Sequence, residues 1–328
     1  MKSHDIQTIS GKKMLLQIND NKVNIFDWLH QYKEDIEDFI STNGALLIRG
    51  LGISNDKEFG EALELVFGEE LANYTYRSTP RREVNQSKVY TATEYHASEV
   101  IPQHNENAYS NSWPMRIGFT CLVPADKMGN TPISDSREAY QKIPIEIREE
   151  FERKNIMYVR NYSDIDLPWE EVFQTTKKTE VEQYCNENNL TFEWTDNGLR
   201  TSQVNQATIM HPTTKEMLWF NQAHLFHSSS LDSEIREGLI ELFGEENLPR
   251  NSFFGDGTPI DEEALSIIRK VFEDTKFSFQ WSKGDLLLLD NMLYTHGREP
   301  YEGNRKILVG MAKKYSSQIH RSRVSTNL

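Results

Sequence analysis

Two residue types that bind divalent metals stand two positions apart in the run Gln103 to Asn107. On an extended segment such residues point to the same side, so His104 and Glu106 can reach one ion. A third ligand must come from elsewhere in the chain, and His296 is the candidate. Two imidazoles and one carboxylate form the facial set of non-haem iron(II) oxygenases. Three protein ligands leave three positions on an octahedral iron, two for a chelating keto acid and one for O₂.

Two further residues suit the recognition of a keto acid. Arg305 follows His296 after a short turn and opens the final strand. An arginine there can hold the far carboxylate of the keto acid through a charge-assisted pair. Thr131, which follows the His104 region, can donate its hydroxyl to the same carboxylate. Taken singly, Arg305 is equally an exposed strand-edge arginine and Thr131 a turn residue.

Alternatives of other classes stay open at this point. A lone His-x-Glu pair is common, and the chain holds nine histidines. A non-catalytic β-barrel module would bind a metal or a small acid and form no product. A zinc hydrolase would need a general base near its metal-bound water and would work without O₂.

Strand patterns flank a more helical middle segment. β-Branched, aromatic or continuous apolar runs predict strands, and they occur at 14–18, 45–50, 88–95, 115–123, 217–220, 277–281, 286–289 and 306–311. Helical spacing occurs at 26–40, 54–67, 234–243 and 261–272. Residues 136–187 are mainly helical in pattern, broken at 155–166. This order predicts a mainly β chain with helices, built on a double-stranded β-helix, or jelly roll. We expect one domain over residues 1–328, with a helical insertion at about 136–205.

The composition limits the partners. The formal net charge is −14 and the pI is near 5.2. Nucleic-acid recognition needs a clustered basic surface, whereas the basic groups here are as short as Arg81-Arg82. No apolar stretch has the length of a membrane span, and the polar start lacks the apolar segment of a signal peptide. Two distant cysteines, Cys121 and Cys185, favour no disulfide and a cytoplasmic location.

Six ordered blocks between about residues 85 and 313 resemble the TauD/TfdA family of Fe(II)/2-oxoglutarate dioxygenases, in particular its SyrP-like branch. The blocks are 90–95, 101–107, 129–137, 218–227, 284–291 and 296–301. The resemblance implies a jelly-roll fold, with Fe(II), 2-oxoglutarate and O₂ as cofactor and co-substrates. It implies His104, Glu106 and His296 as iron ligands, and Thr131 and Arg305 as the 2-oxoglutarate site.

The same resemblance implies the reaction class. We expect oxidative decarboxylation of 2-oxoglutarate, coupled to hydroxylation of an unactivated C–H bond in secondary-metabolite biosynthesis. The expected substrate is an amino acid or a derivative, free or tethered to a peptidyl carrier protein. Desaturation and epoxidation remain alternative outcomes, and the oligomeric state stays open.

Two departures from the family pattern narrow the chemistry. Relatives with anionic substrates carry a second arginine four residues after the 2-oxoglutarate arginine, where this chain has Val309. Halogenating relatives lack the carboxylate ligand, whereas Glu106 is present here.

Further polar residues are candidates for substrate contact, each with a structural alternative. Glu94 and Gln103 precede the predicted ligands, and Asn221 and Gln222 follow a predicted strand. Arg298 lies two residues past His296, so it either points into the site or braces a neighbouring loop.

Overall fold

The computed structural model describes residues 6–19, 23–74, 76–79, 81–85, 87–92, 95–163, 165–196 and 198–317. Its largest sheet has eight strands, in the order β1-β2-β3-β16-β7-β19-β5-β4. Neighbouring strands are antiparallel, except for the parallel pair β2 and β3. The bounds in that order are Ile6–Ile9, Lys12–Gln17, Ala45–Arg49, Leu286–Asp290, Ser112–Val123, Lys306–Ser316, Val89–Thr91 and Glu83–Val84.

A second, three-stranded sheet shares an apolar core with the large sheet. It runs β6-β17-β9, with bounds Ile101–His104, Tyr294–Arg298 and Ile133–Asp135. Phe119 of β7, Ile133 of β9 and Tyr294 of β17 belong to this shared core. Two-stranded pairs complete the strands around it: β8 (Lys127–Met128) with β18 (Tyr301–Glu302), and β13 (Thr208–Met210) with β14 (Met217–Trp219).

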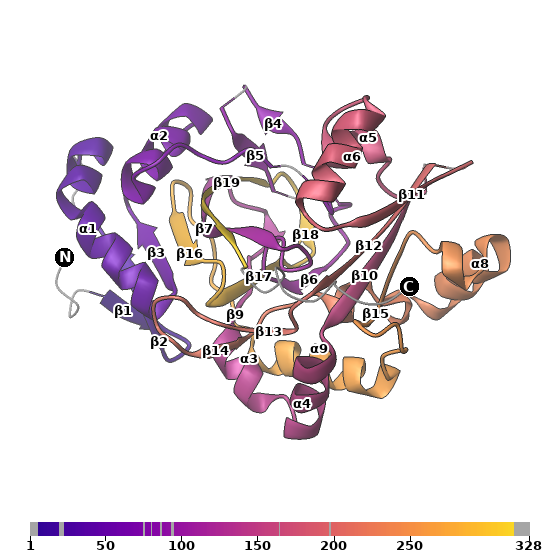
Figure 1. Cartoon of the computed structure of the whole chain (residues 1–328). Coiled ribbons are helices and arrows are strands. Elements are labelled where there is room, and N and C mark those ends of the chain that lie inside the picture. The colour runs from indigo at the N-terminus through magenta and orange to yellow at the C-terminus, as the bar shows by residue number, and fades with distance from the viewer. Residues whose placement is uncertain are drawn as a thin grey trace.

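The apolar run of β16 is continuous because both faces of the large sheet are covered. Leu287 and Leu289 join the core between the sheets. Leu286 and Leu288 join a separate core under α1 (Ile25–Asn43) and α2 (Asp56–Phe67). Successive strand residues point to opposite faces, so a strand buried on both sides has no polar alternation. Figure 1 shows the two helices on one side of the large sheet.

Residues 136–205 form a mixed segment, which corrects the expected helical insertion. The segment contains α3 (Ser136–Lys142), α4 (Ile145–Lys154), α5 (Trp169–Phe173) and α6 (Lys178–Glu187). It also contains strands β10 (Ile156–Tyr162), β11 (Thr191–Thr195) and β12 (Gly198–Asn205). The predicted break at 155–166 is largely β10. These strands pair with β15 (Arg250–Phe254) in the order β11-β12-β10-β15, far along the chain, which local spacing does not reveal.

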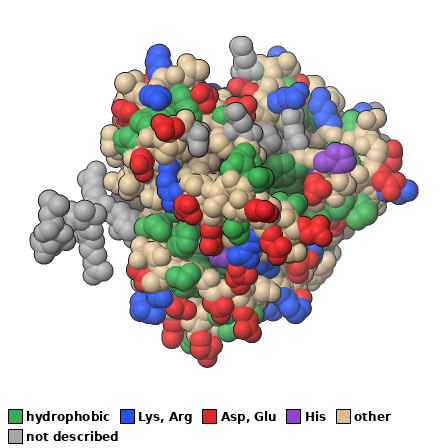
Figure 2. All heavy atoms as spheres, turned by 90° about the vertical axis from the view of Figure 1, so that its right-hand side faces the viewer, with side chains coloured by type: hydrophobic (Ala, Val, Ile, Leu, Met, Phe, Trp, Pro, Cys, Tyr) green, Lys and Arg blue, Asp and Glu red, His purple; other side chains and the backbone are tan. Residues whose placement is uncertain are grey.

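The remaining α-helices lie in the second half of the chain. They are α7 (Ala223–Phe226), α8 (Ser233–Phe243) and α9 (Glu262–Thr275). Figure 1 places α8 at the edge of the molecule, and none of its residues is buried. The strand expected at 277–281 is not formed, and only a single bridge joins Phe277 to Ile133. Acidic side chains are interspersed with apolar and basic ones on the face shown in Figure 2, in keeping with the net charge of −14.

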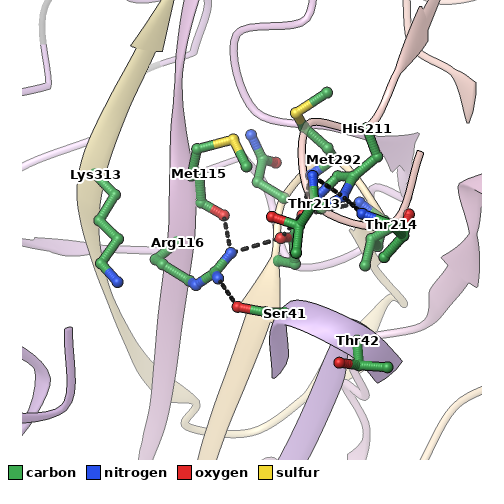
Figure 3. Close-up of polar contacts among 12 residues, drawn as sticks. Ser41, Thr42, Met115, Arg116, His211, Thr213, Thr214, Met292 and Lys313 are labelled. Atoms are coloured by element: carbon green, nitrogen blue, oxygen red, sulfur yellow. Dashed lines mark hydrogen bonds and ion pairs between the residues drawn. The ribbon is translucent and has the colours of Figure 1, made fainter. Parts of the chain in front are cut away.

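A buried polar network secures the turn between β16 and β17. Arg116 of β7 pairs with Asp290 at the end of β16 and with Glu37 of α1. His211 Nε2 lies 3.2 Å from the same Asp290 carboxylate. The other oxygen of Asp290 accepts from the backbone N–H groups of Met292 and Leu293. In Figure 3, Arg116 points toward this turn while also contacting Ser41 of α1. Three elements distant in sequence therefore fix one turn.

We expect Asp290→Asn to lower the free energy of unfolding by about 3 kcal/mol, because it leaves Arg116 buried without its full counter-charge. Urea denaturation followed by circular dichroism measures the change. Asp274→Asn is the control, because Asp274 forms an exposed pair with Lys270 and its loss costs about 0.5 kcal/mol or less. Equal effects of the two substitutions would contradict a structural role for the buried pair.

Candidate active site

The two candidate histidines lie opposite each other on neighbouring strands. β6 and β17 pair antiparallel with His104 facing His296, and the ring centroids are 4.4 Å apart. The register shifts between His296 and Arg298. A Cβ added at Gly297 would lie 2.5 Å from the carbonyl oxygen of Ile101, so only glycine allows this close approach.

The backbone of Glu106 is held by one side chain from the β16–β17 turn. The Glu106 N–H donates to Asn291 Oδ1 at 2.7 Å, and Asn291 Nδ2 donates to the Glu106 carbonyl at 2.9 Å. Asn291 also donates to the carbonyl of Pro114 on β7. Glu106 is thereby set against the element that leads into His296, although the two are far apart in sequence.

The carboxylate of Glu106 is buried and receives a donor on each oxygen. The Tyr74 hydroxyl donates to Oε1 at 3.0 Å, and Arg81 Nη2 donates to Oε2 at 2.6 Å. Burial, followed by the charge of Glu106, raises the pKa of Tyr74 to about 12, so the phenol keeps its proton and remains a donor. These contacts orient the carboxylate.

The structure brings the three predicted ligands together. The ligand atoms of His104, Glu106 and His296 all lie within 4.8 Å of one another. His104 Nδ1 is 2.8 Å from the carbonyl of Pro102, so it carries the proton and leaves Nε2 free. Both ring nitrogens of His296 are buried and find no hydrogen-bond partner among the described residues. An unpartnered imidazole beside a carboxylate and a second imidazole fits a metal ion.

Both imidazoles are held in the form that binds metals. Burial lowers the pKa of His104, and it lowers the pKa of His296 well below its usual range. A proton on His104 would further lower the pKa of His296, and so does the positive charge of Arg81. A neutral imidazole has a lone pair to donate. Two such donors with one carboxylate suit Fe(II).

A cavity that is partly open to solvent adjoins these ligands. Its lining combines apolar side chains with six polar or charged ones, of which three are arginines. The lining residues are Arg81, Ala92, Ile101, His104, Phe119, Thr131, His296, Gly297, Arg298, Arg305 and Ile307. This lining suits a small polar ligand.

The residues expected to bind the keto acid meet on this wall. Arg305 Nε donates to the carbonyl of Gly129 at 2.8 Å, and Nη2 lies 3.3 Å from Thr131 Oγ1. Trp281 Nε1 donates to the same Thr131 oxygen at 3.1 Å. With two donors on that oxygen, the Thr131 hydroxyl proton is free for an acceptor in the cavity. Burial lowers the pKa of Arg305 to about 10, which keeps the guanidinium charged at neutral pH.

Three of the expected substrate contacts instead hold the framework together. Gln103 donates to the carbonyl of Pro132 and accepts from the Thr295 hydroxyl. Asn221 donates to the carbonyl of Ala207, and Gln222 donates to that of Asn105. These interior hydrogen bonds occupy the polar groups of the three side chains. None of Gln103, Asn221 and Gln222 is among the described residues that line the cavity.

Arg298 lines the cavity but also braces a loop. Its guanidinium donates to the backbone carbonyls of Tyr95, His96 and Glu99. The structural alternative foreseen for Arg298 is therefore observed. Glu94, the remaining candidate, lies outside the described residues.

Sequence reasoning missed Arg81 and Tyr74. Arg81 counted only as part of a short basic pair, whereas its side chain is 2% exposed and bonded to Glu106. The two residues precede Glu106 by 25 and 32 positions, on a segment without regular structure. Sequence periodicity does not reveal a contact of this kind. The signal that the sequence offered was the run of charged residues Arg81-Arg82-Glu83.

A two-sheet β core carrying a His-x-Glu pair and a distant histidine is the architecture of a non-haem iron oxygenase. Residues 10–312 match the family model described as "Taurine catabolism dioxygenase TauD, TfdA family". The chain belongs to this family. It is accordingly an Fe(II)- and 2-oxoglutarate-dependent dioxygenase that uses O₂.

Two curated proteins show the relationship in sequence. The dapdiamide synthesis protein DdaC of Enterobacter agglomerans is 42% identical over 278 residues, covering 84% of both chains. The clavaminate synthase-like protein At3g21360 of Arabidopsis thaliana is 26% identical over 294 residues, covering 86% of this chain and 85% of the relative.

Two solved structures confirm the predicted fold class, a jelly-roll core with helices. PvcB, described as an Fe, alpha-ketoglutarate dependent oxygenase from an isonitrile synthetic pathway, superposes with a TM-score of 0.51 at 14% identity. That match covers 90% of this chain and 84% of PvcB. AAD-2 in complex with Mn(II) and N-oxalylglycine superposes with a TM-score of 0.54 at 13% identity. That match covers 94% of this chain and 96% of AAD-2. Within the described part of the chain, no helix combines the length and apolarity that crossing a bilayer requires.

We expect His224 to make stability depend on pH. Burial lowers the pKa of His224 to about 3, so below about pH 6.5 the unfolded chain takes up a proton that the folded protein does not. Its contribution is intact above pH 6.5 and is lost progressively as the pH falls toward 3. The loss between pH 7 and pH 5 is about 2 kcal/mol.

Urea denaturation at both pH values, on wild type and on His224→Gln, measures this contribution as a change in slope with pH. His30→Gln, at an exposed position of α1, is the control and should leave the slope unchanged. A His224→Gln variant with the wild-type slope would contradict the assignment.

Proposed function

We propose that His104, Glu106 and His296 hold the Fe(II) of this dioxygenase. The observation that carries the proposal is the convergence of three ligand atoms within 4.8 Å, with both nitrogens of buried His296 unpartnered among the described residues. The Pro102 carbonyl orients His104, while Tyr74 and Arg81 orient Glu106. Such outer contacts commonly fix metal ligands.

We further propose that Arg305 and Thr131 bind the distal carboxylate of 2-oxoglutarate. The two side chains lie 3.3 Å apart on the cavity wall that also carries the ligands. Gly129, with φ of 73°, turns its carbonyl to accept from Arg305, and a Cβ there would lie 3.2 Å from Arg305 Cδ. The carbonyl leaves other guanidinium N–H groups for the carboxylate. When bound, iron and 2-oxoglutarate would activate O₂, the oxidant, for attack on a C–H bond, and the keto acid would supply two electrons as it is converted to succinate and CO₂.

For the organic substrate we propose an amino acid or an amino-acid derivative in secondary-metabolite biosynthesis, hydroxylated at an unactivated carbon. The support is the 42% identity to a protein named for dapdiamide synthesis. Desaturation or epoxidation by the same centre would give a different product from the same substrate. We infer that residues 1–328 form one catalytic domain, because the family match spans 10–312 and includes the segment 136–205.

We expect purified protein to form succinate from 2-oxoglutarate in the presence of Fe(II), ascorbate and air. The rate should rise when the correct member of an amino-acid panel is added, and mass spectrometry of that member identifies the product. His104→Ala should reduce succinate formation by a factor of about 100 or more. Mutating a residue that only hydrogen-bonds to a metal ligand already lowers metal affinity or activity by about 10- to 100-fold, and His104 is itself a proposed ligand.

The matched control is His30→Ala, which removes an exposed histidine from α1 and should retain wild-type turnover. Fe(II) binding without succinate for any panel member, even when carried on a carrier protein, would favour a non-catalytic metal-binding module. Turnover of a substrate without O₂ would point instead to a hydrolase.

We expect Arg305→Gln to weaken 2-oxoglutarate binding by roughly 10- to 150-fold, since a hydrogen bond to a charged group contributes about 1.5–3 kcal/mol. Thr131→Val should weaken it by roughly fivefold, as for a typical bond of about 1 kcal/mol. Anaerobic titration of the Fe(II)-loaded protein measures both affinities. Lys306→Gln, an exposed neighbour, is the control, and an unchanged affinity in Arg305→Gln would remove Arg305 from the site.

A further inference from the structure

Arg81 is a buried cation whose hydrogen-bonding capacity is only partly used. Its Nη2 donates to Glu106, whereas Nε and Nη1 are buried without an acceptor among the described residues. A buried donor without a partner is unfavourable, and a charged one is more so. Arg81 also lines the cavity, so an anionic ligand there can satisfy these N–H groups.

Arg81 lies on the metal side of the cavity, because its Nη2 donates to Glu106. Arg305 contacts Gly129 and Thr131 instead. The keto-acid site at Arg305 and Thr131 therefore leaves Arg81 available for a second ligand.

Charge counting also favours a second anion and rests on the proposed function. Fe(II) and 2-oxoglutarate carry two positive and two negative charges, which cancel. Glu106 and Arg81 cancel likewise. Arg305 and Arg298, which line the same cavity, then leave two positive charges in excess among the described groups of the site. Uncompensated positive charge in a low-dielectric cavity is unfavourable, so an anionic ligand is favoured over a neutral one.

Among the described residues of β19, only Ile307 lines the cavity, so this strand places no second cation there. Val309, four residues after Arg305, is fully buried in the core between the sheets. Arg81 is also held in place, because Nη2 is tied to Glu106 and the guanidinium lies 5.1 Å from the Tyr74 ring centre. A ligand bound to Arg81 is thus placed at a fixed distance from the metal ligands.

We propose that Arg81 anchors a free carboxylate of the organic substrate beside the metal, through the guanidinium N–H groups that the protein leaves unpaired. The substrate class is then a carboxylic acid, such as an amino acid with its carboxylate free. A substrate tethered through its sole carboxyl group as a thioester lacks this anion. The anchor also couples substrate position to Glu106, because one guanidinium contacts both.

Acetate and its neutral isostere acetamide test the anchor without knowledge of the substrate. Wild-type protein is loaded anaerobically with Fe(II) and 2-oxoglutarate, and each probe is titrated at constant ionic strength. The readouts are the midpoint of thermal unfolding and the visible charge-transfer band of the iron–keto-acid chelate. We expect saturable binding of acetate and at least tenfold weaker binding of acetamide.

In Arg81→Gln, loaded with enough Fe(II) and 2-oxoglutarate to saturate the chelate, we expect acetate affinity to fall at least tenfold while acetamide affinity changes less than threefold. Arg81→Lys keeps the charge and should lie between the two proteins. If circular dichroism shows that Arg81→Gln does not fold, the acetate affinity of Arg81→Lys tests the anchor instead. Arg82→Gln is the matched control, because it removes the exposed neighbouring arginine and should behave as wild type.

Equal acetate binding in wild type and Arg81→Gln would overturn the anchor. So would the absence of any acetate effect on a wild-type protein that forms the chelate. A tenfold loss of 2-oxoglutarate affinity in Arg81→Gln, with acetate binding unchanged, would assign Arg81 to the keto acid instead. Failure of the wild-type protein to form the chelate would overturn the proposed function itself, and this inference with it.

Discussion

The site depends on one side chain, Asn291, which joins the turn after β16 to the backbone of Glu106. The Asn291 side-chain amide accepts from the N–H of Glu106 and donates to its carbonyl. The backbone of Glu106 therefore makes the same two hydrogen bonds that it would make to a neighbouring strand. Asp290, beside it, is fixed by Arg116 and by the N–H groups of the turn. The same turn leads into His296. One buried polar network therefore sets the distance between ligands that are nearly 200 residues apart.

Placing a carboxylate in an apolar core requires compensation, and two residues outside the helices and strands, Tyr74 and Arg81, supply it. Each donates to one oxygen of Glu106, while burial lowers the pKa of both imidazoles and so favours their neutral form. A metal ion at the proposed site would pair with the anion and with the lone pairs of the imidazoles, and neither nitrogen of His296 has a hydrogen-bond partner among the described residues.

Most polar groups around the cavity serve the framework rather than a ligand. Backbone carbonyls accept hydrogen bonds from the side-chain amides of Gln103, Asn221 and Gln222. Arg298 donates to three backbone carbonyls of one loop. Few groups remain to recognise small molecules: the ligands themselves, Arg305 with Thr131, and Arg81. In the function that we propose, specificity comes from Arg305 and Arg81 and from the apolar side chains that line the same cavity.

The sequence by itself determined the fold class and most elements, and it predicted the metal set and the keto-acid pair that we propose. Local spacing brings His104 and Glu106 to one side, apolar periodicity marks α1 and β16, and family blocks supply His296 and Arg305. Only the tertiary structure decided that β10 lies within the supposed helical insertion, that Gln103 is framework, and that Arg81 is buried against Glu106. These features depend on contacts between distant segments, and a charged residue in a loop has the same local pattern whether it faces solvent or a cavity.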